Sequence, residues 1–175
     1  MTDKIKIAIV GSRTYTNKNK VKEFIYKLKE EHGKYVEVVS GGARYGADKF
    51  AKQIALEFEM EYKEFPPYHE PYNIYCVEHV GKYGKKYNVQ HFFLRNKNLV
   101  DYSDAIVAFV KDKKVTNGTK DTINHAKRAN KKVVMGSFFF LSILKYKISF
   151  GSNSKSNHEP LPGIILQLNN SFPLA

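Results

Sequence analysis

Glycine and hydroxyl side chains occur together at three places in this sequence, and each place follows a short apolar run. The three segments are residues 11–13, 40–48 and 116–119. Glycine lets the backbone approach a ligand closely, and backbone N–H groups and hydroxyls donate hydrogen bonds to phosphate oxygens. Arg13 and Arg44 add guanidinium groups, which suit bidentate contact with phosphate. These residue types indicate a site for a phosphate-bearing ligand.

The candidate ligand-binding residues in the three segments are Gly11, Ser12, Arg13, Ser40, Gly41, Gly42, Arg44, Gly46, Thr116, Gly118 and Thr119. A structural alternative is open for each segment. The glycines could simply form tight turns between strands and helices, and hydroxyls such as those of Ser12 and Thr119 could cap helices. The two arginines could instead form ion pairs with Asp48 or Asp104.

Strand and helix patterns alternate along the chain and position these segments. Short apolar runs predict strands at residues 4–10, 35–39, 61–65, 105–110 and 131–135. Apolar residues at helical spacing predict helices at about 19–31, 50–58 and 90–102, and a fourth that opens at 116–119 and ends near 129. Because strands that alternate with helices pair in parallel through right-handed crossovers, the predicted fold class is α/β. The expected architecture is a three-layer, Rossmann-like, doubly wound and mostly parallel sheet of about five strands.

Ligands of such sheets bind where strands end and helices begin. Loops there present unpaired backbone N–H groups and the positive ends of helix dipoles. Each of the three glycine segments comes after a predicted strand: the first two follow directly, and the third follows after residues 111–115. We therefore expect them at one edge of the sheet, around one ligand.

A single domain accounts for residues 1–136 in this interpretation. A stretch rich in tyrosine and lysine at about 66–89 lacks clear periodicity and is predicted to be a long loop or insertion. Its side chains could stack on bases, form a lid over a small nucleotide, or pack on the sheet. Residues 137–175 form a predicted C-terminal appendage in which Glu159 is the sole acidic residue. A poorly ordered tail, an edge strand and a partner-binding segment are all open for it.

The formal net charge is +12, from 29 lysine and arginine residues against 17 aspartate and glutamate residues. This balance favours polyanionic partners such as single-stranded nucleic acid, although many of the lysines fall on predicted helix faces where they would simply be solvated. The one cysteine, Cys76, cannot form an internal disulfide, and no signal-like apolar run follows Met1, so we expect a cytoplasmic protein. The most apolar run, 138–144, is too short to cross a bilayer, so no membrane partner is expected.

The spacing of histidines and of the cysteine does not suggest a metal site. His69, His79 and His91 lie in or beside the insertion, without the spacing of three or four converging ligands. Cys76 has no recognisable base partner in the sequence and is expected to be inert. We therefore expect no metal and no cofactor other than the nucleotide-like ligand itself.

Four motifs, taken together and in order, resemble the SLOG superfamily. They are residues 7–13 (IAIVGSR), residues 40–48 (SGGARYGAD), the pair Arg95 and Asn96, and the pair Gly118 and Thr119. The resemblance covers about residues 4–136 and is greatest to the YspA-type branch. More distant members are the LOG phosphoribohydrolases and the DNA-processing protein DprA. The resemblance implies a Rossmann-like domain that binds a nucleotide or nucleotide-derived ligand.

The resemblance also implies roles for individual residues. Arg95 and Asn96 match the branch pattern and would lie on a helix that overlooks the site, the alternative being ordinary surface positions. The position of the catalytic glutamate in LOG enzymes is here Thr122, which cannot supply a carboxylate for proton transfer. Gly41, Gly42, Gly118 and Thr119 would contact the ligand phosphate. Ser12 and Arg13 would line the same pocket. Asp48 would orient the second loop or contact a ribose.

Three hypotheses about function are open. The first is a sensor or binding module for a nucleotide-like ligand. The second is a nucleotide-processing hydrolase or transferase that acts on a glycosidic bond, with Asp48, Asp104 and Asp121 as candidate carboxylates. The third is DprA-like binding of single-stranded nucleic acid, favoured by the net charge and by residues 40–48, which parallel the second glycine loop of that family. Related proteins commonly pair, so a homodimer is a candidate assembly.

Overall fold

The computed structural model describes residues 4–67, 89–111 and 114–136. In chain order the elements are β1 (Ile5–Gly11), α1 (Lys18–His32), the 3-10 helix η1 (Gly33–Tyr35), β2 (Val36–Ser40), α2 (Ala47–Glu57), β3 (Glu61–Glu64), α3 (Val89–Tyr102), β4 (Ala105–Phe109), α4 (Asn117–Arg128) and β5 (Lys132–Met135). The predicted appendage and nearly all of the predicted insertion lie outside the described residues. None of the helices in the described ranges is both long and apolar enough to span a membrane.

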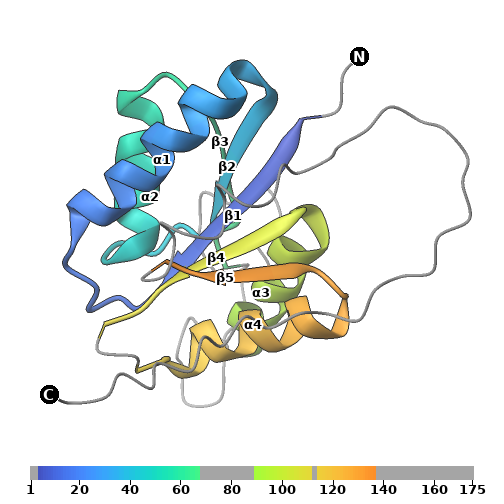
Figure 1. Cartoon of the computed structure of the whole chain (residues 1–175). Helices are drawn as coiled ribbons and strands as arrows, with labels where there is room; N and C mark the ends of the chain where they lie inside the picture. The colour runs from blue at the N-terminus through green and yellow to red at the C-terminus, as the bar shows by residue number, and fades with distance from the viewer. Residues whose placement is uncertain (1–3, 68–88, 112–113, 137–175) are drawn as a thin grey trace, which may run out of the picture.

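The strands form a parallel sheet in the order β3-β2-β1-β4-β5. Helices α1 and α2 cover one face of the sheet, and α3 and α4 cover the other (Figure 1). This arrangement confirms the predicted α/β fold with a doubly wound, three-layer sheet. From β1 the chain winds outward to β2 and β3, then crosses back to place β4 on the other side of β1. The switch point of the topology, where ligands of such sheets bind, therefore lies between β1 and β4.

Strand β1 is buried from both sides. Ile7 and Ile9 belong to the core beneath α1 and α2, together with Phe24, whereas Ala8 and Val10 belong to the core beneath α3 and α4. Successive side chains of a strand point to opposite faces, so a strand that is covered on both faces has an almost unbroken apolar sequence. The apolar run that predicted this strand thus reflects its central position in the sheet.

The ends of α1 are set by local capping. The side chain of Asn17 accepts a hydrogen bond from the Lys20 N–H at 3.0 Å, so the cap at the start of the helix is Asn17 and not Ser12. Gly33 ends the helix with a φ of 54°, and its N–H donates to the Lys29 carbonyl. The helix thus ends at His32, one residue after the end predicted at about residue 31.

Helix α2 begins earlier than the apolar spacing indicated. The sequence pattern predicted a helix from residue 50, but the helix begins at Ala47, directly after Gly46. The Gly46 carbonyl accepts the first helical bond, from the Phe50 N–H at 3.1 Å. Asp48 therefore lies in the first turn of α2 rather than in the loop, where a carboxylate interacts favourably with the helix dipole.

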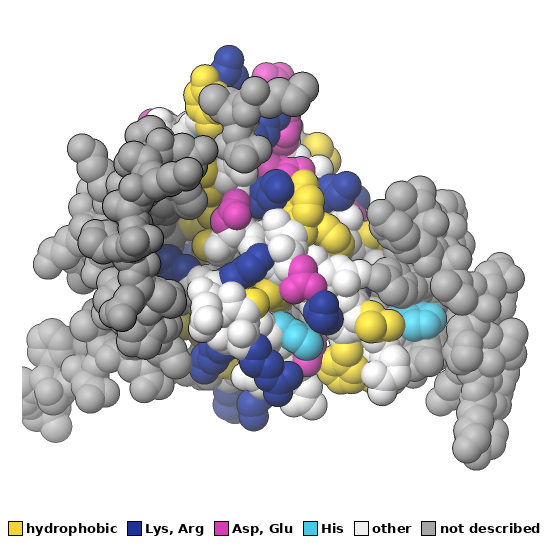
Figure 2. Space-filling model, turned by 90° about the vertical axis from the view of Figure 1, so that its right-hand side faces the viewer, with side chains coloured by type: hydrophobic (Ala, Val, Ile, Leu, Met, Phe, Trp, Pro, Cys, Tyr) yellow, Lys and Arg dark blue, Asp and Glu magenta, His cyan; other side chains and the backbone are white. Residues whose placement is uncertain are grey.

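Figure 2 shows the face of the molecule at which the strands of the sheet begin. Lysine and arginine side chains gather toward the lower part of this face. Helix α4, which has Lys127 and Arg128 in its last turn, ends at this edge because it leads back to the start of β5. Acidic side chains are interspersed among the basic ones over the rest of the face. Part of the excess basic charge therefore lies at the edge opposite the glycine segments.

Lys131 joins the end of α3 to the start of β5. Its Nζ donates to the carbonyl oxygens of Val100, Asp101 and Ser103, at 2.6, 2.8 and 2.5 Å. The last carbonyls of a helix lack intrahelical donors. An ammonium group at this position satisfies them and interacts favourably with the helix dipole.

Lys131→Met keeps the apolar stem of the side chain but removes these donors. We expect the free energy of unfolding to fall by about 2 kcal/mol, because hydrogen bonds to a charged group contribute more than neutral ones. Urea denaturation followed by circular dichroism measures the change. Lys127→Met, at an exposed lysine near the end of α4, is the matched control and should change stability by less than about 0.5 kcal/mol. Equal stabilities of the two variants would contradict this role of Lys131.

Candidate functional site

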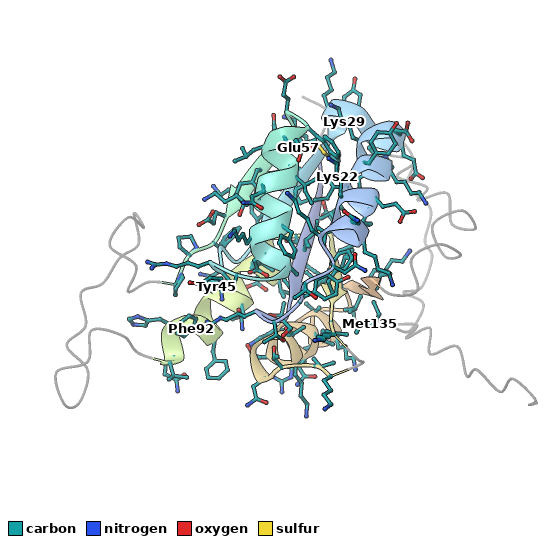
Figure 3. All side chains as sticks on the ribbon, turned by 90° about the vertical axis from the view of Figure 1, so that its left-hand side faces the viewer. Lys22, Lys29, Tyr45, Glu57, Phe92 and Met135 are labelled. Atoms are coloured by element: carbon teal, nitrogen blue, oxygen red, sulfur yellow. The ribbon has the colours of Figure 1, made fainter. Side chains whose placement is uncertain are left out.

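The carboxyl ends of β1, β2 and β4 lie at one edge of the sheet, which faces the viewer in Figure 3. The register places Ile9 beside Ser40 and Gly11 beside Phe109, so the strands end at similar heights. Helices α1, α2 and α4 begin at the same edge, because each follows one of these strands. The topology thus brings together the three segments that carry glycine and hydroxyl residues.

The first two of these segments are in direct contact through Gly46. This residue has a φ of 74°, a conformation that side chains disfavour. A Cβ built on it would overlap the carbonyl oxygen of Ser12 and lie 2.8 Å from the Cα of Arg13. Only glycine lets the two loops approach this closely, so Gly46 has a structural role at this edge.

Two of the candidate hydroxyls are held inside their loops. Ser12 is buried, and its Oγ accepts from the Thr14 N–H at 3.2 Å and lies 2.7 Å from the Thr14 hydroxyl. Ser40 is also buried, and its Oγ accepts from the Gly42 N–H at 3.2 Å and lies 2.7 Å from the Tyr62 hydroxyl. Both serines therefore shape their loops, and backbone N–H groups and guanidiniums become the main candidate donors to a ligand.

Asp48 is a buried carboxylate beneath the second loop. It is 7% exposed, and its Oδ2 accepts from the Ala43 N–H at 3.5 Å. Burial raises the pKa of Asp48 to about 6, against the lowering effects of the Arg95 guanidinium and of backbone N–H groups in the loop. The carboxyl group of Asp48 therefore gains or loses its proton near pH 6, just below neutral pH.

The guanidinium of Arg95 is bound to carbonyl oxygens of the protein. Its Nη1 donates to the carbonyl oxygen of Gly41 and, at 3.2 Å, to that of Phe65. Its Nε donates to Oδ1 of Asn96 at 2.9 Å. A Cβ on Gly41 would overlap this Nη1 and lie 2.9 Å from Oδ2 of Asp48, so the glycine leaves the space that the guanidinium occupies. Arg95 therefore connects α3 to the loop after β2 and to the end of β3.

Asn96 continues this connection to the first turn of α4. Its Nδ2 donates to the Gly118 carbonyl at 3.4 Å and to Oδ2 of Asp121 at 3.0 Å. The hydroxyl of Thr122 donates to the same Gly118 carbonyl at 3.1 Å. One hydrogen-bonded network thus runs from the second loop through Arg95 and Asn96 to the start of α4.

The first turn of α4 presents backbone donors at this edge. The Lys120 N–H bonds to the Thr116 carbonyl at 2.8 Å, so the N–H groups of residues 117–119 precede the intrahelical ladder. The hydroxyls of Thr116 and Thr119 lie 3.0 Å apart. Gly118 is exposed, and among the described residues outside its own turn of helix no heavy atom lies within 4 Å of a Cβ built on it. This open turn has the features of an anion site at a helix N-terminus.

The remaining candidate residues of the glycine segments and of α4 are Gly11, Arg13, Gly42, Arg44 and Asp121. Gly11 packs against the Phe109 carbonyl, and Gly42, with a φ of 68°, packs against the Glu64 carboxylate. Arg13 and Arg44 are exposed on their loops. Asp121 is partly buried and lies 3.5 Å from His125, in addition to its bond with Asn96.

Asp104 lies at the opposite edge of the sheet. It precedes β4, its Oδ2 accepts from the Lys6 N–H at 2.7 Å, and its own N–H donates to the Lys6 carbonyl at 2.8 Å. The three glycine segments follow their strands, whereas Asp104 comes before one. The structure therefore does not bring Asp104 together with the other candidate residues.

Phe92 belongs to this edge, although the sequence patterns did not single it out. The guanidiniums of Arg13 and Arg95 lie 5.7 and 6.0 Å from its ring centroid, within the range of cation–π attraction. The spacing of Phe92 and Arg95, three residues apart on one helix, was an available signal, because such side chains share a face. The contact with Arg13 depends on the fold and leaves no trace in local spacing.

A shallow hollow of about 360 Å³ opens elsewhere on the surface, over α1 and the residue that follows α2. Lys22 in this hollow pairs with Glu57 at 2.5 Å, and both are labelled in Figure 3. The side chains that line the hollow, none of which belongs to a glycine segment, are Asn19, Lys22, Glu23, Tyr26 and Phe58.

Among the described residues, no group of three histidine, cysteine, aspartate or glutamate side chains could hold a metal ion.

Comparisons with known proteins give two matches. Residues 1–62 match the family of DNA recombination-mediator protein A. The fold is similar to that of the molybdenum cofactor binding protein from the phototrophic bacterium Rippkaea orientalis, with 18% identity and a TM-score of 0.57 over 82% of this chain and 86% of that chain. No curated protein matches the sequence. The chain therefore has a Rossmann-like α/β fold, and its residues 1–62 are similar to DNA recombination-mediator protein A.

Proposed function

We propose that the carboxyl edge of the sheet binds a nucleotide or a nucleotide-derived phosphate ligand, and that the protein is a sensor or binding module of the YspA-type branch. The observation that carries this proposal is the open first turn of α4, where the exposed Gly118 leaves room beside the N–H groups of residues 117–119. Backbone donors at a helix N-terminus, together with the helix dipole, favour phosphate oxygens. Arg13 supplies an exposed cation on the loop after β1.

The comparisons support a ligand site on this fold. The structurally similar protein is described as binding the molybdenum cofactor. At 18% sequence identity this similarity shows a shared fold and not a shared ligand. The ligand proposed here accordingly rests on the phosphate-binding features of the strand-end edge.

A nucleotide-processing hydrolase or transferase is a second candidate, and Asp48 is the residue that favours it. A carboxyl group with a pKa of about 6 suits proton transfer near neutral pH. Two observations favour ligand binding without turnover over this enzymatic function. Asp48 lies beneath the loop, next to Gly41 and the Arg95 guanidinium. The LOG-type glutamate position is Thr122, whose hydroxyl bonds to the Gly118 carbonyl.

Binding of single-stranded nucleic acid is a third candidate. The match of residues 1–62 to DNA recombination-mediator protein A and the net charge of +12 favour it. A strand held by many lysines and arginines loses affinity steeply as salt rises, because binding releases counterions. A single phosphate held in an N–H cradle depends much less on salt, so salt dependence separates the two forms of binding.

A thermal-shift panel tests the proposed function directly. The panel contains nucleoside monophosphates, ADP-ribose, NAD, cyclic nucleotides and a short single-stranded oligonucleotide, each at low and moderate salt. A ligand at about 100 times its Kd should raise the Tm by roughly 5–10 °C for a domain of this size. A salt-tolerant shift with a small nucleotide supports the proposal. A shift with the oligonucleotide alone, lost at moderate salt, would contradict the proposal and support binding of single-stranded nucleic acid instead.

Gly118→Asp should abolish the shift with mononucleotides, because the carboxylate repels phosphate from the first turn of α4. The unliganded Tm should stay unchanged or rise slightly, since an acidic residue at a helix N-terminus is favourable. Gly118→Ala is the control, and its small side chain has open space. Retained nucleotide binding in Gly118→Asp would show that the ligand phosphate does not lie at this turn.

A further inference from the structure

The exposed side of helix α4 carries basic residues along most of its length. Figure 1 shows α4 at the outside of the sheet, and its inner side packs on α3 and on the strands. Four residues of its outer side are all exposed, and at about 100° per residue they share one face of the helix. We call this face the α4 stripe, and its members are Lys120, Asn124, Lys127 and Arg128.

Within the part of the chain that the structure describes, the cations of the α4 stripe have no ion-pair partner. Asp121 is the one acidic residue of α4, and its contacts lie away from the stripe. Its Oδ2 accepts from Nδ2 of Asn96 at 3.0 Å, and its Oδ1 lies 3.5 Å from Nε2 of His125. The stripe therefore presents three uncompensated positive charges to solvent.

Several lysines on the opposite side of the sheet differ, because acidic side chains neutralise them. The Nζ of Lys22 in α1 lies 2.5 Å from Glu57 in α2, and the Nζ of Lys27 lies 3.4 Å from Glu23. Such interspersed charges are typical of a solvated surface. The α4 stripe lacks this compensation, so part of the net charge of +12 is concentrated on it.

The spacing of the charges on the α4 stripe fits a row of phosphates. Lys120 and Lys127 are seven residues apart, or about 10 Å along the helix axis, which is too far for convergence on one phosphate. Each strand of a nucleic-acid duplex carries one phosphate per roughly 3.4 Å of its axis, so about three phosphates fall within that length. Three cations on one helix face can therefore neutralise successive phosphates of a polyanion.

The composition of the α4 stripe also discriminates among polyanions. Single strands are held largely by stacking of bases on aromatic rings, and α4 has no phenylalanine, tyrosine or tryptophan. Protein interfaces and membrane-bound helices bury apolar side chains, and the stripe has none. The outside of a duplex presents phosphates and hides the faces of its bases, so cations alone can bind it.

We propose that the α4 stripe binds the phosphate backbone of double-stranded nucleic acid without reading its sequence. This surface is separate from the proposed ligand site, because Lys127 and Arg128 lie about 14 Å along the helix axis from Gly118. DNA and RNA duplexes share the phosphate chemistry, and the test includes both. A failure of the mononucleotide panel would leave this inference standing, and the reverse also holds.

The test is fluorescence anisotropy with the full chain and labelled DNA and RNA duplexes of about 20 base pairs, over a series of salt concentrations. Lys127→Gln with Arg128→Gln should weaken duplex binding by roughly 10- to 60-fold at about 0.1 M salt, because each neutralised phosphate contributes close to tenfold there. The slope of log K against log salt should become shallower by about 2. Duplexes of different sequence should bind equally.

Lys18→Gln with Lys20→Gln is the matched control, because it removes the same charge from two exposed lysines of α1. It should change duplex affinity by less than about threefold, since charges that make no phosphate contact are screened by salt. Both double variants should keep the unliganded Tm of the parent protein, because the substituted side chains are exposed.

Stripe-dependent binding of either duplex supports the inference. Equal losses in the two double variants would show that net charge, and not the α4 stripe, attracts the polyanion, and would overturn it. The inference would also fall if neither duplex bound the parent protein at low salt. Tighter binding of a single strand of the same length, or of polyglutamate, would assign the stripe to a different partner and contradict the inference.

Discussion

Gly46→Ala is expected to lower the free energy of unfolding by more than about 3 kcal/mol, which few single substitutions do. The backbone of Gly46 has a φ of 74° and a ψ of −147°, a region that is essentially restricted to glycine. A methyl group there would also overlap the carbonyl oxygen of Ser12. The loops after β1 and β2 would have to separate, which would also disrupt the start of α2.

Gly118→Ala provides the matched comparison for this effect. Gly118 lies in the first turn of α4, and in the part of the chain that the structure describes no atom beyond its own turn comes within 4 Å of a Cβ built on it. Alanine in a helix is favoured over glycine by about 0.5–1 kcal/mol, so this variant should be as stable as the parent protein or slightly more stable. Urea denaturation of both variants, followed by circular dichroism, measures the difference. Similar denaturation midpoints would contradict the assigned contact between the two loops.

Arg95→Met should have the second large effect, and the size of that effect should depend on pH. The substitution leaves the carbonyl oxygens of Gly41 and Phe65 without this donor and removes the cation that most lowers the pKa of the buried Asp48. Removing one partner from a buried charge pair typically costs about 3–5 kcal/mol, and we expect a loss in this range at about pH 8. The loss should be smaller at about pH 5, where Asp48 can be neutral.

The sign of this dependence follows from the pKa of Asp48. Folding raises that pKa from 3.8 to about 6 in the parent protein. The neutral carboxyl group therefore favours the folded state below about pH 4, and this contribution is lost as the pH rises through about 6. Without Arg95, which lowers the pKa of Asp48, the folded-state pKa rises further and the loss continues to higher pH.

Urea denaturation at three pH values between about 5 and 8 measures the pH dependence of Arg95→Met. The double variant Asp48→Asn with Arg95→Met is the control, because it has no carboxylate at this position. Its free energy of unfolding should vary much less over this range. A deficit in Arg95→Met that is the same at all three pH values would show that Asp48 and Arg95 are not electrostatically coupled.

The sheet and its loops could be predicted because their signals are local. The run from Ile7 to Val10 is apolar because both faces of β1 are covered, and glycine after Val10 marks the turn. Parallel pairing then follows from the alternation of strands and helices. The predicted bounds of the domain, residues 1–136, stay a prediction, because the segments 68–88 and 137–175 lie outside the described residues.

The inner arrangement of the site could not be predicted in the same way. Arg95 was placed on a helix that overlooks the site, but its guanidinium is bonded to the carbonyl oxygens of Gly41 and Phe65, which lie far away in sequence. The hydroxyls of Ser12 and Ser40 were candidate ligand donors, yet both have partners within the protein. Such partners are set by tertiary packing, and no pattern of residue types along the chain records them.

The pairing of β1 with β4 has a consequence for the order of folding. The Lys6 N–H bonds to the carboxylate of Asp104, and the two residues are separated by 98 positions in the chain. During synthesis β1 and β2 can pair early, but the other side of β1 stays open until β4 has been made. Contacts between residues so far apart in sequence slow folding, because a long loop must close before they form. The open side of the central strand makes the nascent chain most vulnerable to pairing with other chains during this interval.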